Sequence, residues 1–173
     1  MRRILARASS LVLMVRTVVA EPYTVPSGSM IPTLLVGDEL IASKYAYGYS
    51  KYSLPLSVPL FDGRIWSGTP ARGDIVVFRL PKDDSTDYIK RVIGLPGDRV
   101  QMKNDVLYLN GKPVPREKVE DYVGDLDGVA GRWTQYRETL PGGERLVLAM
   151  DREVPFLSDR ISGPDRVFVD LAA

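Results

Sequence analysis

Two side chains in this sequence, Ser29 and Lys90, have the residue types of a nucleophile and a base. Ser29 lies in the segment Pro26-Ser27-Gly28-Ser29-Met30. Because glycine accepts sharp backbone conformations, Gly28 allows a tight turn that exposes Ser29 beside its own amide. A serine placed in this way can attack a carbonyl carbon, while its N–H and the Ser27 hydroxyl stabilise the oxyanion. The alternative is that Ser-Gly-Ser forms an ordinary turn or linker.

Lys90 is the candidate base, which a serine hydroxyl needs before it becomes a good nucleophile. In the strand-like run Tyr88–Ile93, alternation places Tyr88, Lys90 and Val92 on one face. Apolar neighbours on that face would remove water from the ammonium group and favour the uncharged amine. The alternative is a solvated lysine on the surface of a strand.

The absence of two residue types narrows the chemistry further. The 173 residues include no Cys and no His. This excludes disulfides, thiol nucleophiles, the Ser-His-Asp triad and metal sites built from Cys or His. The base of a hydrolase must then be Lys, a carboxylate or an amino terminus. The net charge of +1 argues against a nucleic-acid partner. The spacing of Asp and Glu matches no calcium loop, so we expect neither metal nor cofactor.

Three motifs in this order resemble the bacterial type I signal peptidase (leader peptidase) family. They are Pro26–Met30, Gly73-Asp74-Ile75-Val76-Val77-Phe78 and Tyr88-Ile89-Lys90-Arg91-Val92-Ile93-Gly94-Leu95-Pro96-Gly97-Asp98, and the resemblance runs from about Leu11 to about Leu140. It implies that Ser29 is the nucleophile, that Lys90 is the general base and that Ser27 assists the oxyanion hole. The implied substrates are signal peptides of exported preproteins with small residues at positions −1 and −3. The positions that match the family's substrate pockets are mostly apolar: Tyr23, Val25, Pro26, Met30, Leu34, Asp87, Tyr88 and Ile89.

The elements that must position these residues have the sequence pattern of β-strands. Short apolar runs predict strands at 74–78, 88–93, 146–150 and 166–169. Asn110-Gly111 predicts a hairpin between 106–109 and 112–114, and Gly94–Asp98 predicts a turn. The expected fold is therefore mainly β and antiparallel. The resemblance implies a coiled, β-barrel-like catalytic domain after an N-terminal hydrophobic helix.

Residues 1–20 differ in character from the rest of the chain. Arg2, Arg3 and Arg7 precede the apolar run Leu11–Val15, which Arg16 interrupts. The segment is shorter than a complete membrane span of about 20 apolar residues. It is a partial membrane anchor, a cleavable signal or an amphipathic helix packed on the body. We expect a membrane-associated helix over 1–20 and a β-rich peptidase domain over 21–173.

Residues 45–70 are irregular, with several Tyr, Gly and Pro residues. A long surface loop is one interpretation. The other is a hydrophobic flap near the bilayer, because Tyr and Trp66 suit a membrane interface.

Several functions remain open at this point. The first is a signal peptidase at the bacterial inner (plasma) membrane, with membrane lipid as a partner and its catalytic domain on the periplasmic side. A Ser-Lys autoprotease of the repressor type is another, although no helix-turn-helix pattern precedes Ser29. The family's further Gly-Asp-Asn-Arg-Asp-type motif is not found, and the segment 150–160 shares only some of its letters. We therefore expect a domain that is incomplete at its C-terminus. The alternative function is a catalytically weak or inactive homologue with a peptide-binding surface.

Overall fold

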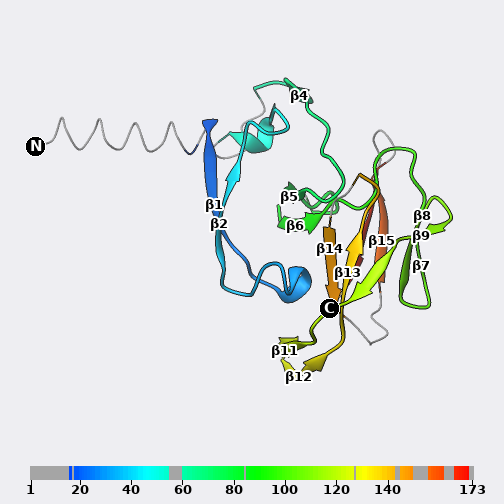
Figure 1. The fold of residues 1–173 in the computed structure, drawn as a ribbon. Helices are drawn as coiled ribbons and strands as arrows, with labels where there is room; N and C mark the ends of the chain where they lie inside the picture. The colour runs from blue at the N-terminus through cyan, green and yellow to red at the C-terminus, as the bar shows by residue number, and fades with distance from the viewer. Residues whose placement is uncertain are drawn as a thin grey trace, which may run out of the picture. The chain divides into compact units, whose positions relative to one another are not determined.

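The computed structural model describes residues 16, 18–54, 60–83, 85–126, 128–142, 145–149, 156–161 and 166–171. It is mainly β, as predicted, and its strands pair in small antiparallel sheets (Figure 1). The chain divides into two compact units. Unit 1 comprises Met1–Thr24 and Asp38–Pro70, and unit 2 comprises Val25–Gly37 and Ala71–Ala173.

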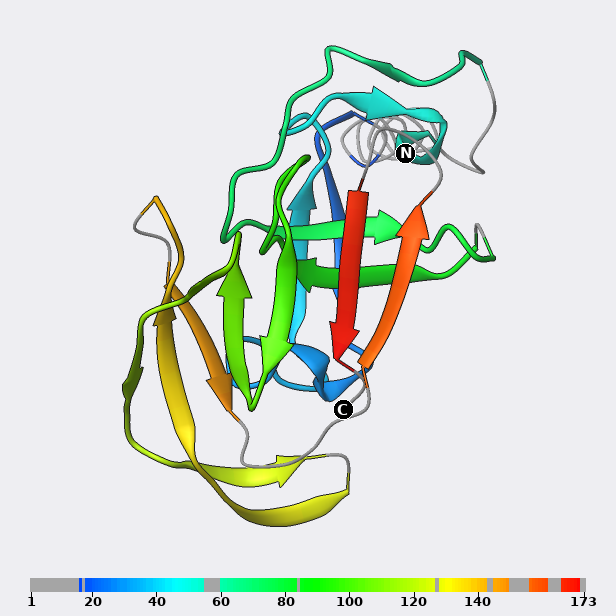
Figure 2. The ribbon, with the colours of Figure 1, turned by 90° about the vertical axis from the view of Figure 1, so that its right-hand side faces the viewer.

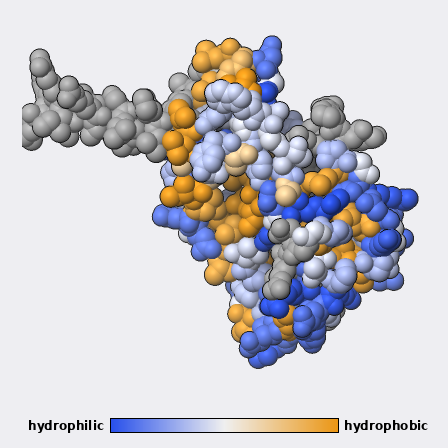
Figure 3. Space-filling model, turned by 45° about the horizontal axis from the view of Figure 1, so that its top comes forward, coloured by the Kyte–Doolittle hydropathy of each residue, from blue (hydrophilic) through white to orange (hydrophobic). Residues whose placement is uncertain are grey.

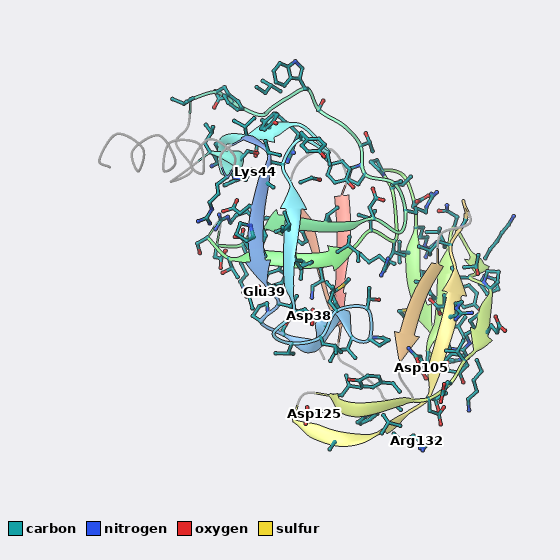
Figure 4. The ribbon with its side chains drawn as sticks, turned by 60° about the vertical axis from the view of Figure 1, so that its left-hand side comes forward. Asp38, Glu39, Lys44, Asp105, Asp125 and Arg132 are labelled. Carbon is teal, nitrogen blue, oxygen red and sulfur yellow. The ribbon has the colours of Figure 1, made fainter. Side chains whose placement is uncertain are left out.

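Unit 1 is built on the antiparallel pair of β1 (Ala20–Thr24) and β2 (Glu39–Ser43), which lie side by side in Figure 1. Lys44 follows β2, at the end opposite Glu39 (Figure 4), and its Nζ lies 2.9 Å from the Glu21 carboxylate of β1. A second ribbon pairs β3 (Tyr49–Ser50) with β4 (Arg64–Ile65), and the short 3-10 helix η2 (Lys51–Ser53) follows β3. The region predicted to be irregular therefore contains a short ribbon.

Unit 2 contains the remaining elements. They are η1 (Gly28–Met30), β5 (Ile75–Arg79), β6 (Asp87–Arg91), β7 (Val100–Lys103), β8 (Val106–Leu109), β9 (Lys112–Pro113), β10 (Arg116–Lys118), β11 (Tyr122–Leu126), β12 (Val129–Trp133), β13 (Gln135–Thr139), β14 (Arg145–Ala149), β15 (Phe156–Ile161) and β16 (Arg166–Leu171). β5 pairs with β6, β11 with β12 and β15 with β16. Two three-stranded sheets, in the orders β7-β8-β9 and β10-β13-β14, complete the unit (Figure 2).

The core of unit 2 is a cluster of buried aliphatic side chains. Leu107, Leu109, Val114 and Leu140 form it, and Ile93, Val100 and Met102 pack against it. Alternation along β8 explains this, because residues two apart point to the same face of a strand and only that face meets the core. Leu107 and Leu109 are buried, whereas Val106 and Tyr108 are partly exposed.

The predicted strands and the predicted turn are confirmed. Each of the four predicted strand runs overlaps an observed strand: β5, β6, β14 and β16. Asn110 and Gly111 have φ angles of 54° and 79° between β8 and β9, as a tight hairpin requires. At Gly94–Asp98, the Asp98 N–H donates to the Leu95 carbonyl at 2.9 Å.

Two predictions fall largely outside the described residues. Residues 1–15 and 17 of the expected N-terminal helix lie outside them, as do residues 150–155 of the segment compared with the further family motif. Within the described part of the chain, no helix has both the length and the apolar character needed to cross a bilayer.

Candidate active site

Lys90 is presented by β6, one strand of a two-stranded antiparallel pair. Val76 of β5 lies opposite Lys90 in the register. The turn between the strands is closed by the Leu80 N–H, which donates to the Thr86 carbonyl at 2.8 Å. Asp83 stabilises the same turn by accepting hydrogen bonds from Ser85 and Thr86. The Thr86 hydroxyl contributes most to lowering the pKa of Asp83 to about 2, followed by the two backbone N–H groups.

Ser29 lies at the centre of the 3-10 helix η1. Ser27 precedes this helix in an extended conformation, Gly28 is buried, and the Ile31 N–H donates to the Gly28 carbonyl at 2.9 Å. The whole segment is closed by the Gly37 N–H, which donates to the Val25 carbonyl at 2.9 Å. The tight turn predicted around Ser29 is therefore present.

The two side chains predicted to carry the chemistry lie in contact within unit 2. Lys90 Nζ donates to Ser29 Oγ at 2.5 Å, and both residues are half-buried. Ser27 Oγ lies 3.5 Å from Ser29 Oγ. If the amine is uncharged, the hydrogen bond reverses and Ser29 donates to Lys90. This is the geometry that a general base needs to take the serine proton.

The surroundings of the Lys90 amine are partly aromatic. The Tyr88 ring, two residues earlier on the same face of β6, has its centroid 5.4 Å from Lys90 Nζ. The Phe78 ring of β5 lies 6.1 Å from the Tyr88 ring. Alternation along the strand thus places Tyr88 beside Lys90, as predicted, and the ring covers part of the amine.

Arg91 connects the strand that carries Lys90 to the segment that carries Ser29. One guanidinium nitrogen donates to the Thr33 hydroxyl at 3.1 Å, and the other donates to the Gly73 carbonyl at 2.8 Å. Gly73 is also fixed to the end of β6, because its N–H donates to the Val92 carbonyl at 2.7 Å. A planar guanidinium can satisfy two acceptors at once, which a lysine ammonium does less well.

Asp98 fixes the turn that follows β6. One of its carboxylate oxygens accepts from the Leu95 N–H at 2.7 Å and from Arg72 Nε at 3.2 Å, and the other accepts from Asn110 at 2.8 Å. The Leu95 N–H is the largest cause of the lowered pKa of Asp98, with Asn110 and Arg72 adding to it against the effect of burial. This carboxylate therefore ties the start of β5 and the β8–β9 hairpin to the turn after Lys90.

The residues predicted to form the substrate pocket are found in different environments. Val25 and Met30 are buried, whereas Leu34, Tyr88 and Ile89 are partly exposed. Pro26 is exposed, and the exposed Asp87 forms an ion pair with Arg79 at 3.2 Å. All of these belong to unit 2, whereas Tyr23 lies on β1 of unit 1.

Four residues around the site, Thr33, Arg72, Arg91 and Asp98, were not assigned roles from the sequence. Arg91 and Asp98 lie inside the third motif, Tyr88–Asp98, and their place in this motif could have indicated that they support the site. Nothing in the sequence indicates that Arg91 contacts Thr33, 58 positions away. Among the described residues, no group of three or more His, Cys, Asp or Glu side chains is arranged to hold a metal ion.

Comparison with known sequences assigns the family. The family model described as signal peptidase, peptidase S26, matches residues 2–156. The chain belongs to the S26 signal peptidase family. It is 50% identical over 133 residues to signal peptidase I of Rickettsia typhi, covering 76% of this chain and 49% of that protein. Signal peptidase I of Rickettsia prowazekii and that of Rickettsia massiliae are each 49% identical over the same length, with the same coverage.

This member of the S26 signal peptidase family spans about half the length of the curated relatives that it matches. The family resemblance inferred from the three motifs is thus confirmed.

Proposed function

We propose that this chain acts as a serine endopeptidase that removes N-terminal signal peptides from exported preproteins, with Ser29 and Lys90 as its catalytic pair. The observation that carries the proposal is the 2.5 Å separation between Lys90 Nζ and Ser29 Oγ. The short helix η1 and strand β6 bring the two groups together from positions 61 residues apart. Membership of the signal peptidase family supports the choice of substrate.

The first half of the reaction is acylation of Ser29. Lys90, as the uncharged amine, accepts the hydroxyl proton while Ser29 Oγ attacks the carbonyl carbon of the scissile peptide bond. The Ser29 N–H and the Ser27 hydroxyl stabilise the oxyanion that develops. The intermediate then collapses, the C–N bond breaks, and the Lys90 ammonium returns its proton to the leaving amine. The acyl-enzyme holds the signal peptide as an ester.

The second half is hydrolysis of that ester. The amine of Lys90, uncharged again after giving up its proton, takes a proton from water, which attacks the ester carbonyl. The second tetrahedral intermediate collapses as the ester C–O bond to Ser29 Oγ breaks, and the Lys90 ammonium gives its proton to that oxygen. The signal peptide leaves as a carboxylic acid, which loses its proton to water. Shallow, mostly apolar pockets lined by those residues of unit 2 that were predicted for substrate binding would admit only small side chains at positions −1 and −3.

We also propose that the chain works at the bacterial inner membrane, with its catalytic domain on the periplasmic side. Arg2, Arg3 and Arg7 precede the apolar run Leu11–Val15. Positive charge before an apolar segment favours the cytoplasmic side for the N-terminus. The small sheets would then belong to a coiled, β-barrel-like peptidase domain over 21–173.

The test is cleavage of a preprotein with Ala at positions −1 and −3, compared between the wild type and four variants. Ser29→Ala and Lys90→Ala are each expected to abolish cleavage. Ser67→Ala and Lys82→Ala are matched controls, since both residues are exposed and lie outside the proposed pair. Unchanged cleavage by Ser29→Ala or Lys90→Ala would refute the catalytic pair. A wild type that binds the peptide without cleaving it would favour the non-catalytic homologue.

A further inference from the structure

The turn between β8 and β9 combines an asparagine with a following glycine. The sequence has two Asn residues: Gly111 follows Asn110, and Asp105 follows Asn104 in the β7–β8 turn. Both Asn residues have a positive φ, 54° and 47° respectively. Because glycine has no Cβ, its backbone nitrogen can approach the preceding side chain without hindrance. The Gly111 nitrogen can therefore attack the amide carbon Cγ of Asn110 more readily than Asp105 can attack Asn104.

The Asn110–Gly111 turn is open to solvent. Both residues are exposed. Apart from the residues next to Gly111 in the chain, no described atom lies within 4 Å of the position that a Cβ of Gly111 would occupy. Hydrophilic side chains cover much of the right-hand part of the face shown in Figure 3, where the β7-β8-β9 sheet lies. Water, the reactant that hydrolyses an amide, therefore has access to the turn.

The Asn110 side chain is held by hydrogen bonds from both ends of its amide. The Arg99 N–H donates to Oδ1 at 2.8 Å, and Nδ2 donates to the Asp98 carboxylate at 2.8 Å. The Asn110 N–H also donates to the Arg99 carbonyl at 2.8 Å. A donor on Oδ1 stabilises the negative charge that develops there when a nucleophile attacks Cγ. The contact with Arg99 thus favours attack on this amide.

The same side chain supports the turn that follows Lys90. The Asp98 carboxylate, which accepts from Asn110, also accepts from the Leu95 N–H at 2.7 Å. Three residues after Lys90, Ile93 packs against the buried cluster that β8 contributes to. The end of strand β6 is therefore fixed to the β8–β9 hairpin by apolar packing and by the hydrogen bond from Asn110.

We propose that the Asn110–Gly111 turn is a modification site, at which spontaneous deamidation slows the peptidase by loosening the turn that follows Lys90. This inference rests on the function proposed above. The Gly111 nitrogen forms a bond to Asn110 Cγ, and the Cγ–Nδ2 bond breaks. The proton of the Gly111 nitrogen passes through water to Nδ2, which leaves as ammonia. Water then adds to one of the two carbonyl carbons of the resulting succinimide and opens the ring, which leaves aspartate or isoaspartate at position 110.

Deamidation replaces the N–H donor that faces Asp98 by a second carboxylate. Hydrogen bonds, chiefly from the Leu95 N–H, hold the pKa of Asp98 below its ordinary value, so this group is an anion at neutral pH. Two carboxylates at this distance repel each other and cannot share a hydrogen bond. The turn after Lys90 then loses one of its supports. A small displacement of a catalytic group lowers the rate of the chemical step, so we expect kcat to fall by about 10-fold with little change in KM.

The first test locates the modification in the full chain. The wild type is aged in buffer at mildly alkaline pH, and a peptide map by mass spectrometry follows deamidation at both Asn residues. Asn110 is expected to convert while Asn104 stays largely unchanged, and the activity of the aged protein should fall in proportion to the fraction converted at Asn110. Asn110→Gly is the matched variant, because glycine accepts the positive φ and cannot deamidate. Its initial activity should persist under the same conditions.

The second test measures the consequence for preprotein cleavage. Asn110→Asp should show the lower kcat and nearly unchanged KM, whereas Asn104→Asp, the matched control in the β7–β8 turn, should cleave like the wild type. The proposal is overturned if Asn110 stays intact during ageing or if Asn104 converts as fast. It is also overturned if Asn110→Asp cleaves like the wild type, if only its KM rises, or if Asn104→Asp loses as much kcat. A freshly purified wild type that does not cleave refutes the proposed function and with it the effect on catalysis, while the peptide map still decides whether the site is modified.

Discussion

Replacing Glu138 by Gln should remove a large part of the pH dependence of this protein's stability. Glu138 lies on β13, the central strand of the β10-β13-β14 sheet, and is only 1% exposed. Its Oε2 accepts no hydrogen bond within the described part of the chain. Arg116 lies opposite in the register, but its guanidinium packs over the Tyr136 ring at 4.5 Å and donates to the Asp105 carbonyl at 2.8 Å.

This environment favours the protonated acid. Burial raises the pKa of Glu138 from 4.5 to about 7, and the positive charge of Arg116 opposes the rise only in part. The folded state therefore binds the proton more tightly than the unfolded state. The resulting stabilisation is complete below the unfolded pKa and is lost as the pH rises through about 7.

The magnitude follows from the two pKa values. The full effect is about 3 kcal/mol, because a tenfold change in an ionisation constant corresponds to about 1.4 kcal/mol. As the pH rises from about 5 to about 8.5, ionisation of Glu138 should lower the free energy of unfolding by about 2.5 kcal/mol. Glu138→Gln cannot ionise and should lose that dependence.

Urea unfolding at the two pH values, followed by tryptophan fluorescence, measures this difference. Glu117→Gln is the matched control, since Glu117 is an exposed carboxylate on β10. It should keep the pH dependence of the wild type. A Glu138→Gln protein that loses as much stability as the wild type between the two pH values would refute the reasoning.

Three further outcomes follow from the contacts around the site and in unit 1. Arg91→Lys should lower kcat by about 10- to 100-fold with little change in KM, because a small displacement of the catalytic groups slows the chemical step more than it weakens substrate binding. Thr33→Val should lower kcat by a smaller factor. A rise in KM with unchanged kcat would contradict a positioning role for Arg91. Asp98→Asn should reduce the free energy of unfolding by about 2 kcal/mol near neutral pH. Because the pKa of Asp98 is lowered in the folded state, the difference between wild type and variant should shrink as the pH falls through that pKa. Gly48→Ala should lower the free energy of unfolding, measured by thermal unfolding, by about 1–3 kcal/mol more than Gly63→Ala. Both glycines have a positive φ, but of the two only Gly48 has atoms within 4 Å of an added Cβ. Equal losses in the two variants would show that the contacts of the new Cβ at position 48 are relieved.

Local patterns predicted the elements that carry the candidate site. Asn110-Gly111 predicted its hairpin because few residues other than Asn and Gly accept consecutive positive φ angles. The apolar alternation around Lys90 predicted β6 and the position of Tyr88 beside the amine. Residue types made Ser29 and Lys90 candidates for a nucleophile and its base. The resemblance was needed to imply that they act together, since no local rule brings together residues 61 positions apart.

Other features could not be predicted, for identifiable physical reasons. The β11–β12 hairpin was missed because Gly124 and Gly131, which face each other in the register, interrupt the apolar alternation that marks a strand. Glu138 was not recognised as buried, because a charged residue in a polar stretch is usually exposed. Its burial depends on β10 and β13 lying side by side, which is a property of the sheet rather than of either strand.

A double-mutant cycle on Ser29 and Lys90 tests the central claim most directly. The quantity measured is the rate of preprotein cleavage by the wild type, Ser29→Ala, Lys90→Ala and the double variant. Groups that act as one unit are strongly non-additive, so the double variant should be no slower than the slower single variant. Independent losses that multiply in the double variant, or a Lys90→Ala protein as fast as the wild type, would contradict the account.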